Sequence, residues 1–247
     1  MRIAVAGGTG VAGRMIVEAL RARGQETVTL SRGAGVDLLT GTGLDDALTG
    51  ADAIVDASNV TTMSRSVSVD FFERAGRNLA DAARKAGVRH LVSLSIVGID
   101  RVKSPYYAGK LRQEEIVRAG AVPWTIQRAT QFHEFPGQLL ARIPGPIAIV
   151  PSGPGQPIAV REVAEELAEI VLGEPRGMAP DLAGPRVETL AGMARRLMAA
   201  GLIRRRPVLP VHIPGGTSAG GVLPAAGGPR GVVTFDEWLT SQRQIQQ

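Results

Sequence analysis

Three glycines at a fixed spacing, placed directly after the first apolar run of the chain, constrain the fold more than any other feature. Residues 3–6 read as a buried strand, and residues 11–23 have the periodicity of an amphipathic helix. Between them, Gly7 allows a tight turn, Gly10 lets the backbone approach a pyrophosphate, and Gly13 lets the helix pack close to the strand. The free N–H groups of the helix N-terminus favour phosphate oxygens. The predicted phosphate-binding loop for a dinucleotide comprises Gly7, Thr9, Gly10, Val11 and Gly13.

The first 130 residues alternate between short apolar runs and longer amphipathic stretches. The apolar runs show no strict polar alternation, which indicates strands that are buried on both faces. Alternation of strands and helices predicts an α/β fold with a doubly wound, Rossmann-type parallel sheet that carries helices on both sides. The expected strands are residues 3–6, 27–31, 53–57, 91–95 and 124–128, and the expected helices are residues 11–23, 67–86 and 108–119.

The chain changes character beyond Phe135. Proline and glycine are frequent in residues 136–160, which we expect to form loop with one strand near residues 147–150. Residues 207–229 are a glycine-, proline- and alanine-rich segment, which predicts an irregular excursion over the surface.

The remaining C-terminal residues favour helices packed beside the sheet. Helices are expected at residues 161–172 and 187–200, and a short final helix after the capping box formed by Thr234 and Glu237. We therefore divide the chain into a nucleotide-binding core, residues 1–132, and a small substrate-side region, residues 133–247. The second region is expected to pack on the same sheet and to interleave with it.

The residues after the second predicted strand favour NADP(H) over NAD(H). An NAD-specific site places an acidic residue about 20 residues beyond the last loop glycine, where it accepts hydrogen bonds from the ribose hydroxyls. This chain has Arg32 there, beside Ser31, and no carboxylate nearby. A guanidinium suits a dianionic 2′-phosphate, so we expect Ser31 and Arg32 to contact the cofactor. The alternatives are that Arg32 is a solvated strand end and that the glycine loop is a turn without a ligand.

Further motifs carry a family resemblance. The loop has the spacing G-x-x-G-x-x-G, residues 76–88 form a long Ala-rich helical stretch, and residues 124–133 combine a strand with the turn after it. Together they resemble the short-chain dehydrogenase/reductase superfamily in its atypical, NmrA-like branch of NAD(P)H-binding proteins. The resemblance is dense over residues 1–135 and faint after about residue 205. It implies adenine contacts from Asp37 and Leu38, and a segment beneath the cofactor made of Ala57, Ser58 and Asn59.

Tyr106 and Lys110 have the Y-x-x-x-K spacing of that superfamily. Residues four apart on a helix share one face, so both side chains can meet one ligand. In this arrangement Lys110 hydrogen-bonds the nicotinamide ribose and lowers the pKa of the phenol, and Tyr106 donates a proton to a carbonyl oxygen. The alternatives are an ordinary exposed pair on a helix, and a proton donated by Tyr107, one residue out of register.

Two further residues, Ser95 and His133, are candidate site residues whose roles are left open. Ser95 matches the first serine of a pair common in the superfamily, but Ile96 and Val97 follow it, so the usual triad is incomplete or displaced. We expect Ser95 to face the cofactor. His133 lies after the strand at residues 124–128, on the substrate side of such folds, where an imidazole can donate a proton near neutral pH. The alternative for His133 is a structural histidine.

Composition narrows the remaining classes of protein. The 247 residues contain no cysteine and three histidines, which excludes disulfides and thiolate metal sites and disfavours a histidine-rich metal centre. The net charge of +5 comes mostly from scattered arginines, without a nucleic-acid-binding motif. The uncharged runs at residues 143–160 and 207–229 are broken by proline and glycine, so neither predicts a membrane span. Without a targeting signal or cysteine, the sequence favours a cytoplasmic protein.

These inferences favour one function and leave a second open. We expect an NADPH-dependent oxidoreductase that transfers hydride to a small organic substrate such as a quinone, a ketone or a related conjugated carbonyl compound. Its expected catalytic residues are Tyr106, Lys110 and His133, with no metal, nucleic-acid or membrane partner, and with a homodimer left open. The alternative is a catalytically silent, NmrA-like NADP(H)-sensing regulatory protein, which the incomplete triad favours. A sugar-nucleotide epimerase is disfavoured, because the C-terminal region is short for a bulky nucleotide sugar.

Overall fold

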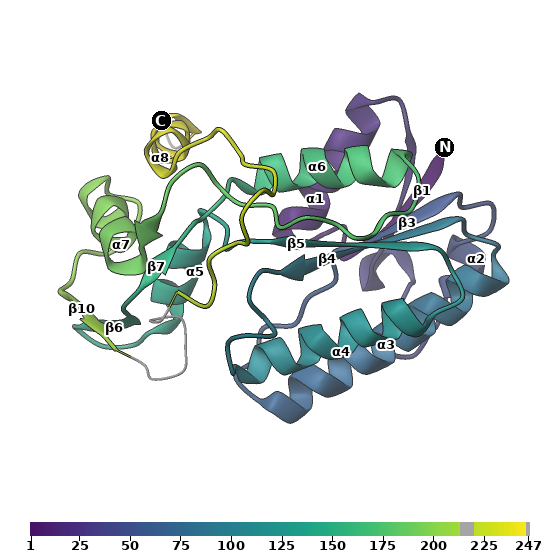
Figure 1. Cartoon of the computed structure of the whole chain (residues 1–247), viewed down its shortest axis with the longest axis horizontal. Helices are drawn as coiled ribbons and strands as arrows, with labels where there is room; N and C mark the ends of the chain where they lie inside the picture. The colour runs from purple at the N-terminus through teal and green to yellow at the C-terminus, as the bar shows by residue number, and fades with distance from the viewer. Residues whose placement is uncertain (213–219, 246–247) are drawn as a thin grey trace.

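The structure, a computed structural model, describes residues 1–212 and 220–245. Within these residues the central element is a six-stranded parallel sheet with the strand order β2-β1-β3-β4-β5-β8 (Figure 1). Its strands are β1 (Arg2–Ala6), β2 (Glu26–Leu30), β3 (Ala53–Asp56), β4 (His90–Ile96), β5 (Trp124–Ala129) and β8 (Gly177–Met178). One face is covered by α1 (Val11–Ala22) and α6 (Val160–Leu172), and the other by α3 (Arg65–Lys85) and α4 (Pro105–Ala119) (Figure 1). The predicted doubly wound, Rossmann-type α/β fold is confirmed.

Successive side chains of each central strand enter opposite core layers. Ile3 and Val5 pack in the layer under α1 and α6, whereas Ala4 and Ala6 pack in the layer under α3. All four side chains are fully buried. Because β1 and β3 are buried on both faces, each contains a continuous apolar run, whereas the edge strand β2 is half-buried and alternates threonine with apolar residues.

The topological switch point of the sheet lies between β1 and β3. From β1 the chain first pairs β2 on one side, and then passes through η1 (Arg32–Ala34) and α2 (Leu44–Ala47) to pair β3 on the other. At the carboxyl ends, Ala6 pairs with Asp56, and the N–H of Ala57 donates to the Ala6 carbonyl at 3.0 Å. Open α/β sheets bind ligands in the crevice outside such strand ends, which makes this the candidate site.

A second group of elements lies beyond the carboxyl edge of the sheet (Figure 1). These elements are α5 (Phe135–Arg142), β6 (Ala148–Pro151), β7 (Pro154–Gly155), β9 (Glu188–Thr189), α7 (Leu190–Ala199), β10 (Val208–Val211) and α8 (Phe235–Ile245). Strand β10 pairs with β6, and β9 pairs with β7. Helix α6 and strand β8 also lie within residues 133–247, but they pack on or pair with the main sheet. The division of the chain at residue 132 stays a prediction.

Helix α5 and strand β10 are among the elements that differ from the sequence prediction. Helix α5 lies largely in residues 136–160, which we predicted as loop, because Pro136 occupies the start of the helix, where a missing N–H costs no hydrogen bond. Strand β10 lies in residues 207–229, which we predicted as irregular, and residues 213–219 of that segment lie outside the described residues.

The predicted capping box opens α8. The N–H of Thr234 donates to Glu237 Oε2 at 2.8 Å, and the N–H of Glu237 donates to Thr234 Oγ1 at 3.3 Å. Two backbone donors at the helix start are thereby satisfied.

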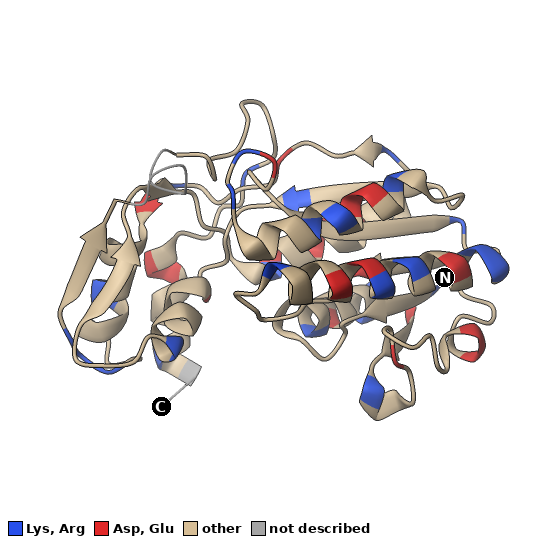
Figure 2. Cartoon of the chain, turned by 90° about the horizontal axis from the view of Figure 1, so that it is seen from below, with Lys and Arg blue, Asp and Glu red and all other residues tan. Residues whose placement is uncertain are grey.

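Acidic and basic side chains are interspersed along α3 and α4 (Figure 2). Arg112 of α4, for example, pairs at 2.8 Å with Glu73 of α3 and at 2.8 Å with Glu115 of its own helix. In the part of the chain that the structure describes, no helix has the length and apolarity needed to cross a membrane.

Candidate nucleotide-binding and catalytic site

The glycine loop after β1 is shaped by contacts that leave no room for side chains. Gly7 has a φ of +73°, and a Cβ there would lie 2.6 Å from the carbonyl oxygen of Ala57. A Cβ at Gly13 would overlap the carbonyl oxygen of Gly7. The two glycines therefore allow the loop to pack against the end of β3 and the helix to pack against the loop.

The front of the loop is open. Thr9, Gly10 and Val11 are exposed, and Gly10 caps α1 without a side-chain hydrogen bond. The first turn of α1 contains no acidic residue, so its N–H groups and the positive end of its dipole are available to an anion. This arrangement fits the pyrophosphate of a dinucleotide.

The turn after β3 forms the other wall of the switch point. The N–H of Ser58 donates to Asp56 Oδ1 at 2.9 Å, and Gln113 Nε2 of α4 donates to Asp56 Oδ2 at 2.6 Å. The Ser58 hydroxyl is buried without a hydrogen-bond partner among the described residues, while Asn59 is exposed. Asp56 thus fixes the turn Ala57–Ser58–Asn59, and the Ser58 hydroxyl remains without a partner among the described residues, which also fits a polar ligand.

The residues assigned to the adenosine end follow β2. Arg32 is exposed at the start of η1, and within the described residues its guanidinium has neither a hydrogen bond nor an ion pair. Ser31, half-buried, precedes it. Asp37 Oδ1 accepts from the N–H of Leu39 at 2.8 Å, and Asn78 of α3 donates to the Leu38 carbonyl at 2.8 Å.

Tyr106 and Asn59 meet at the carboxyl edge of the sheet. The Tyr106 hydroxyl donates to Asn59 Oδ1 at 2.7 Å, which joins the first turn of α4 to the turn after β3. Burial raises the pKa of Tyr106, and burial also raises the pKa of Tyr107, opposed by a hydrogen bond with Gln131. The lowered pKa expected for Tyr106 is therefore wrong, because desolvation dominates the environment of its phenol.

Within the described residues, Lys110 makes no hydrogen bond to the Tyr106 hydroxyl. Its buried Nζ donates to the Leu94 carbonyl at 2.6 Å and to Gln113 Oε1 at 2.5 Å. Burial lowers the pKa of Lys110 to about 8, opposed by the carboxylates of Asp56 and Glu114. The predicted Tyr–Lys pair therefore shares a helix face, but the ammonium is engaged with β4 and α4, and a ribose contact by Lys110 stays a prediction.

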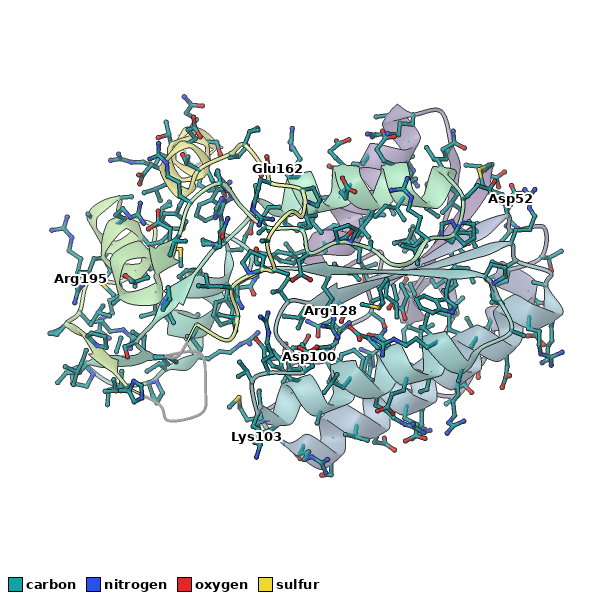
Figure 3. All side chains as sticks on the ribbon, in the orientation of Figure 1. Asp52, Asp100, Lys103, Arg128, Glu162 and Arg195 are labelled. Atoms are coloured by element: carbon teal, nitrogen blue, oxygen red, sulfur yellow. The ribbon has the colours of Figure 1, made fainter. Side chains whose placement is uncertain are left out.

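Ser95 belongs to a buried polar cluster between β4, β5 and α4. Its hydroxyl donates to Glu114 Oε1 at 2.6 Å, and Arg128 binds both oxygens of Glu114 at 2.8 Å. Arg118 donates to the same carboxylate at 2.6 Å, and Arg128 also pairs with Asp100 at 2.8 Å (Figure 3). These contacts use the Ser95 hydroxyl within the protein, and its predicted contact with the cofactor stays a prediction.

Sequence reasoning missed Gln113 and Glu114. Both are fully buried, although neither belongs to the motif that singled out Lys110. Their signal is positional, because residues three and four after Lys110 lie on the same face of α4. Gln113 accepts a hydrogen bond from the Lys110 ammonium and donates one to Asp56, and Glu114 accepts one from Ser95. These contacts link the turn after β3 to the core.

His133 packs against the C-terminal helix. It is 1% exposed, its Nε2 lies 3.0 Å from the Val233 carbonyl, and its ring contacts Phe235 and Trp238. Burial lowers the pKa of His133, so the imidazole is held neutral. These contacts favour the structural alternative for His133, and its catalytic role stays a prediction. Within the described residues no cluster of three or more His, Asp or Glu side chains could hold a metal ion.

A glycine loop and an open helix N-terminus at the switch point of a doubly wound sheet define a Rossmann-type nucleotide-binding protein. The family model described as NAD(P)H-binding matches residues 7–172. The chain belongs to this NAD(P)H-binding family, which confirms the NAD(P)H-binding resemblance seen in the sequence.

A curated relative is a reductase. The (4-alkanoyl-5-oxo-2,5-dihydrofuran-3-yl)methyl phosphate reductase of Streptomyces griseus subsp. griseus is 33% identical over 145 residues. The alignment covers 53% of this chain and 48% of the relative, so the chain spans about half the length of the protein it matches.

Solved structures of reductases share the fold. The dTDP-4-dehydrorhamnose reductase of Clostridium acetobutylicum matches with a TM-score of 0.78 at 15% identity, over 100% of both chains. The NADPH-dependent quinone oxidoreductase of Escherichia coli, solved with NADPH, matches with a TM-score of 0.72 at 18% identity, over 97% of this chain and 99% of that one. At these identities the likeness concerns the fold alone.

Proposed function

We propose that the chain is an NADPH-dependent reductase of a small organic molecule that contains a conjugated carbonyl group, such as a quinone or an unsaturated lactone or ketone. The observation that carries this proposal is the hydrogen bond of 2.7 Å from the Tyr106 hydroxyl to Asn59 Oδ1. It holds a proton donor at the carboxyl end of β3, next to the loop that fits a dinucleotide. The relative from Streptomyces supports this substrate class, because its name describes a furanone that bears an alkanoyl group.

Arg32 supports NADPH over NADH. Its exposed guanidinium follows β2, where the 2′ position of the adenosine ribose lies in proteins of this fold. A free cation favours a 2′-phosphate, whereas a ribose with a bare 2′-hydroxyl gains more from a carboxylate. The loop glycines and the N-terminus of α1 would hold the pyrophosphate, and the turn after β3 would pass beneath the cofactor.

The chain supplies the proton for the reduction, and the cofactor, when bound, supplies the hydride. With its pKa raised by burial, Tyr106 stays protonated throughout the neutral range and can donate from Oη to a substrate oxygen. Asn59 accepts from that hydroxyl in the free protein and thereby fixes its position. Tyr107, the neighbouring phenol, is the rival donor.

Lys110 acts in this proposal as a positioning residue. Its Nζ donates to Gln113, Gln113 donates to Asp56, and Asp56 accepts from the N–H of Ser58. This chain of hydrogen bonds fixes the turn that carries Asn59, the partner of Tyr106. Lys110 thus supports the proton donor without a hydrogen bond to its hydroxyl.

Two titrations and a substrate panel test the proposal. NADPH should bind at least about tenfold more tightly than NADH, and Arg32→Ala should abolish that preference. NADPH absorbance should then fall only when a quinone, an unsaturated ketone or a furanone is added. An unchanged preference in Arg32→Ala would refute the role of Arg32, and a preference for NADH would refute NADPH as the cofactor.

A second function, an NADP(H)-sensing regulatory protein, is favoured by the Ser95 hydroxyl. That hydroxyl donates a hydrogen bond to Glu114 Oε1, and Lys110 donates to the Leu94 carbonyl, so a serine–tyrosine–lysine triad is not assembled in the described residues. Tight binding of NADPH without turnover of any compound in the panel would favour the sensor over the reductase.

A further inference from the structure

Helix α5 ends in an arginine that reaches from the C-terminal region to the loop after β3. Arg142 is the last residue of α5, and its Nη2 donates to Thr61 Oγ1 at 3.3 Å. Thr61 follows Asn59 by two residues, a separation of at most about 7 Å between Cα atoms. The Arg142 guanidinium and the Tyr106 hydroxyl therefore contact side chains that lie two residues apart in the same loop, since Tyr106 donates to Asn59.

The charge of Arg142 is uncompensated. Its side chain is exposed, and within the described residues it forms no ion pair. Arg128 and Arg196, which also join separate elements, are held by the carboxylates of Glu114 and Glu188, whereas Arg195 and Arg206 bind backbone carbonyls. Arg142 instead meets a single neutral hydroxyl at a long distance, and this weak contact is readily exchanged for another.

An anion is the partner that a guanidinium in this position lacks. Its planar fork donates two parallel hydrogen bonds to two oxygens of a phosphate or carboxylate, and these are stronger than a bond to a hydroxyl. Release of the Thr61 hydroxyl costs little, because Thr61 is exposed and water can replace the lost partner.

We propose that Arg142 binds an anionic group of the substrate, of the phosphate-ester class, while the carbonyl group to be reduced lies at Tyr106. This assignment rests on the proposed reductase function and adds a specificity determinant to it. The two anchor points come from different parts of the chain, so a substrate would be held between the sheet and the C-terminal region. The name of the relative from Streptomyces, which describes the phosphate ester of a furanone, is consistent with this class.

The test uses two matched compounds, a (4-alkanoyl-5-oxo-2,5-dihydrofuran-3-yl)methyl phosphate and the corresponding alcohol without the phosphate. In Arg142→Gln, the KM for the phosphate ester should rise about tenfold or more, with kcat and the KM for the alcohol nearly unchanged. Arg243→Gln is the matched control. Arg243 lies exposed on α8 and forms no hydrogen bond or ion pair within the described residues, so its loss removes the same charge.

The outcomes separate this assignment from the proposed function. If the wild type reduces both compounds with equal KM, or if Arg142→Gln weakens both equally, Arg142 binds no anion and the reductase stands. If the wild type reduces neither, the reductase proposal fails for these compounds, and calorimetric titration of the phosphate ester into NADPH-saturated protein decides the anion site. Binding that Arg142→Gln abolishes supports the site, and absence of binding overturns it.

Discussion

Tyr106 is the side chain on which the proposed proton transfer depends. Tyr106→Phe removes the hydroxyl but keeps the ring, which packs edge-on against Phe72 with centroids 5.9 Å apart. A positioned general acid contributes about a hundredfold or more to the rate, so kcat should fall by about that factor. The Kd for NADPH should stay near the wild-type value, because the phosphate loop lies elsewhere. Steady-state kinetics and a fluorescence titration measure these two effects.

Tyr107→Phe is the control for this substitution. Both phenols lie in the first turn of α4, and burial raises the pKa of each. If Tyr107→Phe loses activity and Tyr106→Phe keeps it, Tyr107 is the donor. Wild-type turnover in both variants would remove both phenols from the mechanism.

Gly13 tests the close packing of α1 on the phosphate loop. A methyl group at Gly13 would overlap the Gly7 carbonyl, so Gly13→Ala must push the helix away from the loop. Overpacking of this kind costs about 1–3 kcal/mol, and we expect a loss of unfolding free energy in this range together with weaker NADPH binding. Urea denaturation and NADPH titration measure the two changes.

Gly33→Ala is the matched control for Gly13→Ala. A Cβ at Gly33 would meet no atom within 4 Å, and the backbone there is not left-handed. Gly33→Ala should therefore leave both stability and NADPH affinity near their wild-type values. Wild-type NADPH affinity in Gly13→Ala would contradict the role assigned to the close contact.

Individual site residues were predictable from the sequence only where the backbone itself carries the function. Backbone geometry requires glycine at Gly7 and Gly13, and the G-x-x-G-x-x-G spacing of the loop was sufficient to predict this requirement. The spacing of Tyr106 and Lys110 placed both on one helix face but did not reveal how their side chains are used. Burial and competing hydrogen-bond partners decide how the side chains are used. The Lys110 ammonium, for example, donates to Gln113, and no motif contains this contact.

Helix α6 anchors the segment that leads into α8. Glu162 in its first turn accepts hydrogen bonds from the N–H groups of Val232, at 2.5 Å, and Val233, at 3.1 Å (Figure 3). Glu162→Ala leaves both donors without this acceptor, so the unfolding free energy should fall by about 1–3 kcal/mol. Hydrogen exchange should accelerate most in α8 and in residues 230–234, because the hydrogen bonds to Glu162 join these residues to α6, which packs on the sheet.

Glu166→Ala on the same helix is the control for Glu162→Ala. Its carboxylate makes no hydrogen bond or ion pair within the described residues, so its removal should leave exchange in α8 unchanged. If hydrogen exchange in Glu162→Ala accelerates equally over the whole chain, the substitution lowers the stability of the whole fold and Glu162 does not anchor this segment locally.

Among the elements, α1, α3 and the strands β1 to β5 were predicted, whereas α5 and β10 were not. Helices α1 and α3 have clear apolar stripes, and β1 and β3 contain uninterrupted apolar runs. Helix α5 was missed because Pro136 and Gly137 signal a turn, although proline is tolerated in a first helical turn. Strand β10 contains Pro210, and its pairing with β6 depends on a contact between distant parts of the chain.

At the scale of the whole molecule, the candidate site combines parts that are far apart in the sequence. The turn after β3, the start of α4 and the end of α5 meet through Asn59, Tyr106 and Arg142. The sheet topology, which the sequence predicted, brings the carboxyl ends of the strands together. The position of α5 follows from packing within the C-terminal region, so the contact between Arg142 and Thr61 had no signal in the sequence.

Two buried histidines couple the stability of the whole fold to pH. His90 begins β4, and its Nε2 lies 2.8 Å from Thr125 Oγ1 of β5, whereas His133 packs under α8. Burial lowers the pKa of both side chains. In the unfolded chain a histidine has a pKa of about 6.5, so below that pH the unfolded state binds protons that the folded state does not.

The free energy of unfolding should therefore be fully retained above about pH 6.5 and should fall as the pH is lowered towards the depressed pKa values of the folded state. His90→Gln should reduce this pH dependence, because glutamine can keep a hydrogen bond to Thr125 and does not titrate. His212→Gln is the control, since His212 is exposed in the described structure. Urea denaturation of the three proteins at a series of pH values from neutral to mildly acidic measures the difference. If His90→Gln loses stability with acid as steeply as the wild type and as His212→Gln, the neutral form of His90 contributes nothing to the fold.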